Sequence, residues 1–232
     1  MFHLGWCFEK GDGIAQDMTR AAQWYQKAAN SGNVDAMFHL GLCYAKGDGI
    51  KQNTKQAVEW YRKAAKQENT DAMFYFGLCL KKGDGIKQNT KQAVEWYQKA
   101  AEKGNADAMF SLGLCLKKGD GIKQDTKQAV EWYQKAAEKG NADAMFHLGV
   151  YFEKGDGVAQ DKNKAVEWYQ KAAAKGNVDA MFHLGSCFEN GNGVARDMKQ
   201  AVKWYQEAAI LGNADARRCL ILCKQRSRSS AK

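Results

Sequence analysis

Hydrophobic and polar residues follow two alternating patterns along this chain. In residues 36–46, apolar side chains occupy nearly every face of a helix, which is typical of a helix packed on several sides. In residues 54–67, apolar side chains form one stripe and charged side chains lie opposite, which predicts an amphipathic helix. That stripe consists of Ala57, Val58, Trp60, Tyr61, Ala64 and Ala65. Together the two segments predict a helix-turn-helix unit.

This unit recurs every 36 residues without an insertion, starting at Met1. We assign residues 1–216 to six repeats (1–36, 37–72, 73–108, 109–144, 145–180 and 181–216), residues 217–223 to a partial seventh repeat that forms a capping helix, and residues 224–232 to a basic disordered tail. A single helix pair cannot bury its apolar faces alone, so the pairs must stack. The sequence therefore predicts an all-α, right-handed α-solenoid superhelix.

Glycines and polar residues mark the ends of the helices. A Gly-x-Gly pair, first seen as Gly11 and Gly13, is expected to end the first helix with positive φ angles. An Asp or Asn precedes each second helix and is a candidate N-cap, with Gln three residues later in four copies as in a capping box. A glycine inside each first helix, such as Gly41, predicts close contact with a neighbouring helix. Glu68 replaces the glycine that ends the second helix in the other copies, so we expect a strained or looser turn there.

These features resemble the Sel1-like repeat family, a relative of the tetratricopeptide repeats. The matching residues in the second copy are Ala36, Leu40, Gly41, Tyr44, Gly47, Gly49, Ile50, Asn53, Ala57, Trp60, Tyr61, Ala64, Ala65 and Ala72. The pattern covers residues 1–216, and its departures are Phe76, Leu80, Leu116 and Glu68. The resemblance implies an adaptor or scaffold that binds proteins.

Similarity to tetratricopeptide geometry implies that positions 2, 6, 9 and 10 of each repeat line a concave face formed by the first helices. The candidate partner-binding residues are Phe38, Phe74, Phe110, Phe146, Leu42, Leu78, Leu114, Lys46, Lys81, Lys82, Lys117, Lys118 and Lys154. The phenylalanines could instead pack mainly between neighbouring repeats. The ligand expected on this face is a protein or peptide with apolar anchors and acidic residues.

The net charge of +9 suggests a nucleic-acid partner, so its distribution along the chain matters. Six of the basic residues lie in residues 217–232, which contain no acid, so residues 1–216 carry a net charge of only +3. This distribution argues against a polyanion partner for the repeats. Two alternatives stay open: a nucleic-acid-binding helical repeat protein, and a regularised repeat scaffold without a ligand.

The remaining candidate chemistry is sparse. Four histidines occupy position 3, four residues before the cysteine column at position 7, and such a pair could give two metal ligands on one helix face, but the pattern breaks at Tyr75, Ser111 and Tyr151. The Gly-Asp-Gly turns lack the oxygen ligands that calcium needs. No constellation of unique residues predicts catalysis, so we expect no enzyme, no metal and no cofactor.

Cysteines one repeat apart are expected to lie too far from each other for disulfides. Cysteine-rich secreted members of the family instead pair cysteines at positions that here hold Ala65 and Ala72. With no signal peptide and no apolar run of membrane-spanning length in the sequence, we expect a cytoplasmic protein, unless an upstream segment is missing. The oligomeric state is left open.

Overall fold

The computed structural model describes residues 1–229, and these residues form thirteen α-helices and no strand. The predicted all-α repeat fold is confirmed. The helices are α1 (Phe2–Lys10), α2 (Met18–Asn30), α3 (Val34–Lys46), α4 (Thr54–Lys66), α5 (Thr70–Lys82), α6 (Thr90–Glu102), α7 (Ala106–Lys118), α8 (Thr126–Glu138), α9 (Ala142–Lys154), α10 (Lys162–Ala174), α11 (Val178–Asn190), α12 (Met198–Ile210) and α13 (Ala214–Ser229).

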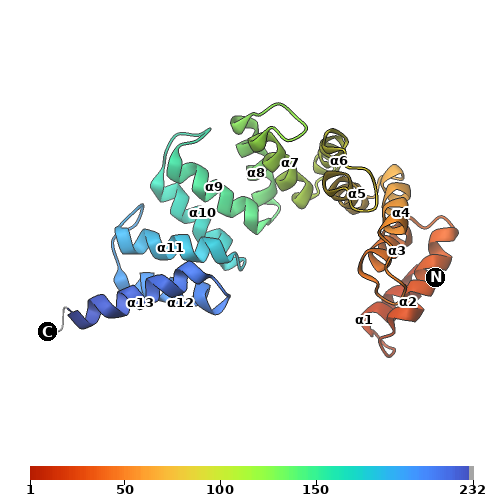
Figure 1. Ribbon diagram of the computed structural model, residues 1–232, viewed down its shortest axis with the longest axis horizontal. Helices are drawn as coiled ribbons and strands as arrows, with labels where there is room; N and C mark the ends of the chain where they lie inside the picture. The colour runs from red at the N-terminus through yellow and green to blue at the C-terminus, as the bar shows by residue number, and fades with distance from the viewer. Residues whose placement is uncertain (230–232) are drawn as a thin grey trace. The chain divides into compact units, whose positions relative to one another are not determined.

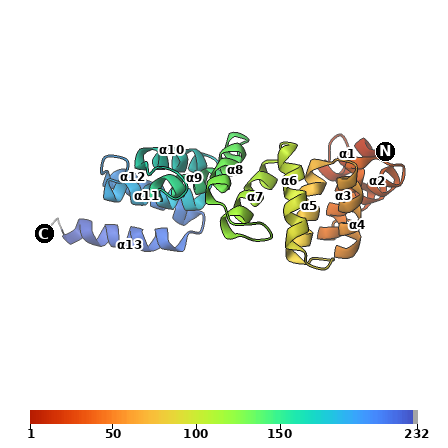
Figure 2. The same cartoon turned by 90° about the horizontal axis from the view of Figure 1, so that it is seen from above.

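The helices belong to two compact units, Met1–Gln124 and Asp125–Lys232. Within the first unit, α3 packs against α4 of the same repeat, and α4 packs against α5 of the next (Figures 1 and 2). The second unit follows the same rule, with α10 packed between α9 and α11. Within each unit, a second helix such as α4 or α10 therefore lies between two first helices, as stacked helix pairs require.

A fully buried tyrosine forms the centre of every repeat. Tyr25, Tyr61, Tyr97, Tyr133, Tyr169 and Tyr205 occupy this position. A Cβ atom added to Gly41 would lie 2.6 Å from Cε1 of Tyr61, so the helix backbone lies directly on the aromatic ring. The predicted close contact of the inner glycine is confirmed, and its main partner is the tyrosine ring of the same repeat.

The predicted N-caps of the second helices are confirmed in all six repeats. In the second repeat, Oδ1 of Asn53 accepts a hydrogen bond from the backbone N–H of Gln56 at 3.1 Å. In a capping box, the side chain of Gln56 would in turn accept a hydrogen bond from the backbone N–H of Asn53. This part of the prediction is wrong, because that N–H donates to the carbonyl of Tyr44 at 2.9 Å. The turn folds back on the end of the first helix, which brings this carbonyl within reach.

The first helices have caps of their own, which also connect successive repeats. The side chain of Asn105 accepts a hydrogen bond from the backbone N–H of Ala108, and its Nδ2 donates to Oδ1 of Asp71 in the preceding repeat, each at 2.8 Å. Asn177 makes the same bond to Asp143 in the second unit. One asparagine column therefore both starts a helix and fixes the register between neighbouring repeats.

The helix at the end of the chain is longer than predicted. The sequence predicted a capping helix ending at residue 223 and a disordered tail over 224–232, whereas α13 continues to Ser229. The residues after Cys223 include lysine, glutamine and arginine and neither glycine nor proline, so nothing in the local sequence ends the helix there. Residues 230–232 lie outside the described residues.

The strained turn predicted at Glu68 is confirmed, since this glutamate has a φ of 68° where Gly104 in the next repeat has 94°. The left-handed conformation costs a non-glycine residue roughly 1–2 kcal/mol. The 3.2 Å contact between Glu68 and Lys103 is largely exposed and compensates for little of this cost.

We expect Glu68→Gly to stabilise the protein by about 1 kcal/mol, because glycine adopts this conformation without strain. The reverse change in the next repeat, Gly104→Glu, should destabilise it by a similar amount. The measurement is the urea midpoint of unfolding, followed by circular dichroism. Glu68→Gln keeps the backbone strain and removes the charge, so a midpoint for this control as high as that of Glu68→Gly would contradict the explanation.

Candidate peptide-binding groove

A groove of about 400 Å³ lies between α3 and α5 in the first unit. Four of the residues predicted to bind a partner line it: Leu42, Lys46, Leu78 and Lys82. Ala45, Tyr61, Tyr75 and Asp84 also contribute to its walls. Apolar side chains, two lysines and aromatic rings thus meet in one surface depression, which is the composition expected of a peptide-binding groove.

The predicted phenylalanines are half-buried and pack between repeats. The ring of Phe38 lies 6.0 Å from the ring of Tyr61 in its own repeat and 5.5 Å from that of Tyr75 in the next. In the second unit, Phe146 makes the same two contacts with Tyr169 and His183. These contacts support the packing interpretation of the phenylalanine column, and contact with a ligand stays a prediction.

The other predicted residues are distributed over several helices. Lys81 is half-buried, and its Nζ lies 3.6 Å from Sγ of Cys115. On α7, Phe110, Leu114 and Lys117 are half-buried and Lys118 is exposed. Phe74 is half-buried on α5, and its ring lies 5.9 Å from that of Tyr97. Lys154 is exposed on α9 and belongs to the second unit.

Position 9 of the repeat controls the environment of the buried tyrosine hydroxyl. This column consists of Glu9, Ala45, Lys81, Lys117, Glu153 and Glu189. Wherever the residue is glutamate, the tyrosine hydroxyl donates a hydrogen bond to its carboxylate: Tyr25 to Glu9 at 2.7 Å, Tyr169 to Glu153 at 2.7 Å, and Tyr205 to Glu189 at 2.8 Å. The sequence marked this column as variable and did not reveal that it contacts the core tyrosine.

The first histidine of the next repeat also approaches this carboxylate. Nδ1 of His39 lies 3.3 Å from Oε2 of Glu9, and Nζ of Lys10 lies 2.9 Å from Oε1. Burial alone would raise the pKa of Glu9, but the hydrogen bonds from Tyr25 and Lys10 and the charge of His39 outweigh burial and lower that pKa. Burial and the bond to Glu9 also raise the pKa of Tyr25, so its hydroxyl remains a donor. Tyr25, Lys10 and His39 of the next repeat thus surround the Glu9 carboxylate.

Two other tyrosines lack this acceptor. The hydroxyls of Tyr61 and Tyr97 are buried and have no hydrogen-bond partner among residues 1–229. Position 9 of their repeats holds Ala45 and Lys81, whose side chains offer no acceptor at neutral pH. Burial raises the pKa of Tyr61, so this hydroxyl also keeps its proton. A buried, unpaired hydroxyl is unfavourable and calls for a physical explanation.

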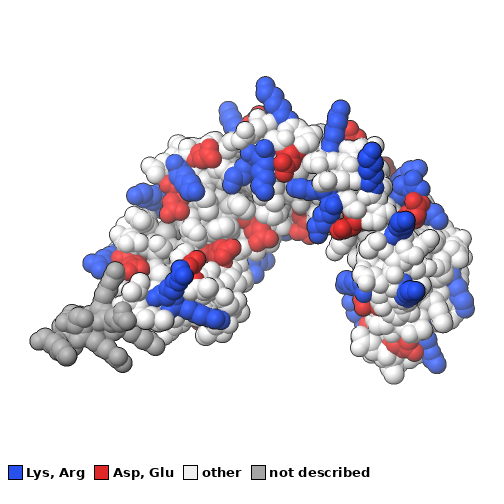
Figure 3. All heavy atoms as spheres, viewed as in Figure 1, with Lys and Arg blue, Asp and Glu red and all other residues white. Residues whose placement is uncertain are grey.

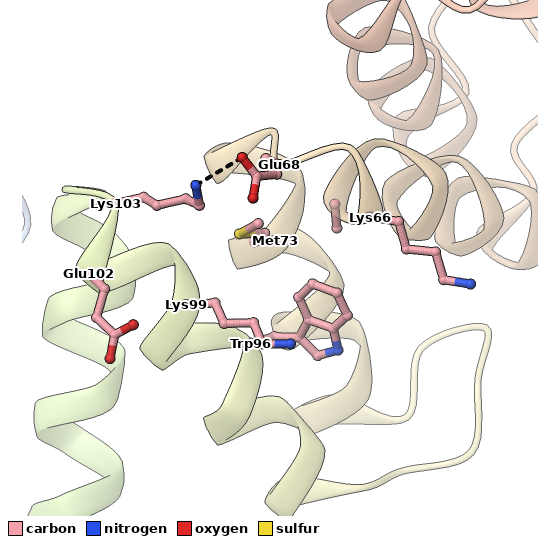
Figure 4. Close-up of a pocket in the computed structure, with 8 residues that line it drawn as sticks. Lys66, Glu68, Met73, Trp96, Lys99, Glu102 and Lys103 are labelled. Carbon is pink, nitrogen blue, oxygen red and sulfur yellow. Dashed lines mark hydrogen bonds and ion pairs between the residues drawn. The ribbon is translucent and has the colours of Figure 1, made fainter.

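A second hollow, of about 500 Å³, lies on another part of the first unit (Figure 4). The figure shows Glu68 and Lys103 facing each other beside Met73, with Trp96 and Lys99 below them. Nζ of Lys99 lies 4.7 Å from the centre of the Trp96 ring, a cation–π contact. Equivalent lysine–tryptophan pairs recur in other repeats, including Lys63 with Trp60 and Lys135 with Trp132, so this pair is a feature of the scaffold.

The thiols of the first helices are mostly buried. Cys7, Cys43, Cys79, Cys115 and Cys187 form no disulfide, and burial raises the pKa of Cys43 and Cys79 to about 11, which keeps these two thiols protonated and unreactive. Among residues 1–229, no three His, Cys, Asp or Glu side chains are grouped in a way that could hold a metal ion.

Charges of both signs are distributed over the surface (Figure 3). Lysine and arginine side chains are interspersed with aspartate and glutamate over the face drawn in Figure 3. Such a mixed surface differs from the continuous basic stripe typical of nucleic-acid-binding proteins. Within residues 1–229, no helix has both the length and the apolar character needed to cross a bilayer.

Replacing the buried tyrosine by phenylalanine should change the stability of the protein by different amounts in different repeats. Tyr169→Phe removes a donor from a partly buried carboxylate and should destabilise the protein by about 1–2 kcal/mol. Tyr61→Phe removes a hydroxyl without a partner and should leave stability within about 0.5 kcal/mol of the wild type, or raise it. Urea unfolding compares the two variants directly. Equal losses would show that Tyr61 has an acceptor in solution.

Comparison with known proteins identifies the repeat. The model of the Sel1 repeat matches residues 1–33, 34–69, 70–105, 106–141, 142–177 and 178–213. These boundaries lie three residues before ours from the second copy on, because that unit begins at the start of the first helix. No curated protein matches the chain.

Solved structures show the same arrangement of helices. A Sel1 repeat protein from Oxalobacter formigenes is 36% identical with a TM-score of 0.83, over 89% of this chain and 83% of that one. A protective antigen present in uropathogenic Escherichia coli strains, with an SLR fold, is 34% identical with a TM-score of 0.87, over 94% of this chain.

This chain spans 47% of the length of that antigen. The immunity protein PA5088 from Pseudomonas aeruginosa, 24% identical with a TM-score of 0.60 over 93% of this chain and 81% of that one, shares the fold. Together, the six matched repeats and these structures show that the chain belongs to the Sel1 repeat family.

Proposed function

We propose that this protein is a non-enzymatic adaptor that binds a peptide or a protein segment on the face formed by its first helices, centred on the groove between α3 and α5. Sel1 repeat proteins generally mediate protein–protein interactions and are typically non-enzymatic scaffolds. The observation that carries the proposal is the groove itself, where Leu42 and Leu78 offer apolar contacts between two lysines, Lys46 and Lys82.

The composition of the groove favours a ligand with both apolar and acidic side chains. Leu42 and Leu78 are half-buried, so covering them removes apolar surface from water. Lys46 and Lys82 are exposed, and Asp84 is the acidic residue among the lining residues, which leaves the groove with a positive balance. Complementary charge of this kind speeds association and selects among partners more than it adds affinity.

The free cysteines support a reducing compartment such as the cytoplasm as the place of action. Cys7, Cys43, Cys79, Cys115 and Cys187 form no disulfide, and disulfides are rare where glutathione and thioredoxin keep thiols reduced.

Selection from a phage-displayed library of random dodecapeptides tests the proposed function. Peptides selected on the wild type should bind the double variant Lys46→Glu/Lys82→Glu at least about tenfold more weakly, because both charges of the groove are reversed. The matched control is Lys55→Glu/Lys91→Glu, which makes the same charge change at exposed positions of α4 and α6. It should bind like the wild type.

Fluorescence anisotropy with labelled synthetic copies of the selected peptides gives the dissociation constants. Equal binding to both double variants would place the interaction elsewhere on the molecule and reject the groove. A selection that yields no peptide at all would reject peptide binding itself.

A further inference from the structure

The groove lies where one repeat lacks a side chain that other repeats have. In the first repeat, the Glu9 side chain reaches across the surface to the Tyr25 hydroxyl. In the second repeat, the same position is Ala45, whose side chain ends at Cβ. Ala45 and Tyr61 both line the groove, so the space that a glutamate would fill is part of it.

The other groups that surround the carboxylate in the first repeat have counterparts in the groove. Lys10 corresponds to Lys46, Tyr25 to Tyr61 and His39 to Tyr75, and all three counterparts line it. The rings of Tyr61 and Tyr75 lie 5.5 Å apart, comparable with 5.0 Å between Tyr25 and His39. The lysine and the buried tyrosine of the carboxylate site are thus kept and a second tyrosine replaces the histidine, while the carboxylate is absent.

The buried hydroxyl is a second, independent sign of a missing group. Tyr61 is 1% exposed, and its hydroxyl has no hydrogen-bond partner among residues 1–229. Its donor therefore lacks the acceptor that Tyr25, Tyr169 and Tyr205 have in their glutamates. A carboxylate from outside the chain would satisfy this donor with a charge-assisted bond, the stronger kind of hydrogen bond.

We propose that the groove between α3 and α5 binds an aspartate or glutamate side chain of a peptide ligand, whose carboxylate accepts a hydrogen bond from Tyr61 and lies beside Lys46 and Lys82. The ligand thereby takes the place that Glu9 occupies in the first repeat. This inference rests on the proposed peptide-binding function and adds the group that the groove recognises.

The neighbouring repeat explains why the proposal concerns this groove. Tyr97 also lacks an acceptor, but position 9 there holds Lys81, which places a long side chain where Ala45 leaves space. The Lys81 ammonium lies 3.6 Å from Sγ of Cys115 in the next repeat. Within the first unit, position 9 next to Tyr25 holds a glutamate and position 9 next to Tyr97 a lysine, whereas position 9 next to Tyr61 holds only the methyl group of Ala45.

Two substitutions test the site with the selected peptides, synthesised with acetylated N-termini and amidated C-termini so that only side chains provide carboxylates. Ala45→Glu supplies an internal carboxylate, which should raise the melting temperature of the free protein and weaken peptide binding at least about tenfold. The matched control Ala174→Glu makes the same change at an exposed helical position of the second unit and should alter neither property.

A double-mutant cycle identifies the hydrogen bond itself. In the wild type, replacing one acidic residue of the peptide by its amide should weaken binding at least about tenfold. In Tyr61→Phe, the loss of peptide affinity caused by the same replacement should be at least about threefold smaller, because the donor is absent. This coupling is a readout that a merely structural role of Tyr61 would not produce.

The outcomes separate this inference from the proposed function. Peptides that lose affinity for Lys46→Glu/Lys82→Glu but bind Ala45→Glu as they bind the wild type would overturn the carboxylate site and leave groove binding intact. An acidic-to-amide effect of the same size in the wild type and in Tyr61→Phe would also overturn it. If the lysine substitutions have no effect either, the proposed groove fails together with the inference.

Discussion

The packing of one tyrosine ring against one helical glycine is the contact on which the whole repeat depends. The ring lies where a Cβ atom would otherwise be, so the first helix can lie directly on the second. All six tyrosines are fully buried, and the glycine–tyrosine contact is present in the helix pairs α1–α2, α3–α4, α5–α6, α9–α10 and α11–α12. A fully buried tyrosine brings a polar hydroxyl into the core, where this group needs a hydrogen-bond partner.

The repeats differ in whether this hydroxyl has an acceptor, and the difference lies in the residue at position 9. Glu9, Glu153 and Glu189 accept the hydrogen bond, whereas Ala45 leaves the hydroxyl of Tyr61 without an acceptor. Substitutions that only maintain a scaffold would keep the acceptor, because an unpaired buried hydroxyl is unfavourable by roughly 1–3 kcal/mol. The proposal of a ligand at Tyr61 therefore rests on a position at which the repeats differ.

Most of the local structure was predictable from sequence because it depends on residues close together in the chain. The N-cap at Asn53, the end of the first helix at Gly47 and the strain at Glu68 all follow from local preferences, and the structure confirms each one. The capping box failed because the backbone N–H of Asn53 found a partner nine residues upstream. The role of position 9 was also hidden, since glutamate and tyrosine meet across 16 residues and two helices.

A repeat protein can tolerate an unsatisfied group in one copy because its stability is approximately a sum over repeats and their interfaces. In the second repeat, the hydroxyl of Tyr61 has no partner among the described residues, while the junction after the first repeat keeps its Glu9, Tyr25 and His39 contacts. If a ligand provides the missing acceptor, as proposed for the groove, pairing the Tyr61 donor favours the bound state. Among copies of one unit, removing a side chain from the surface of a stable repeat is thus a direct route to a binding site.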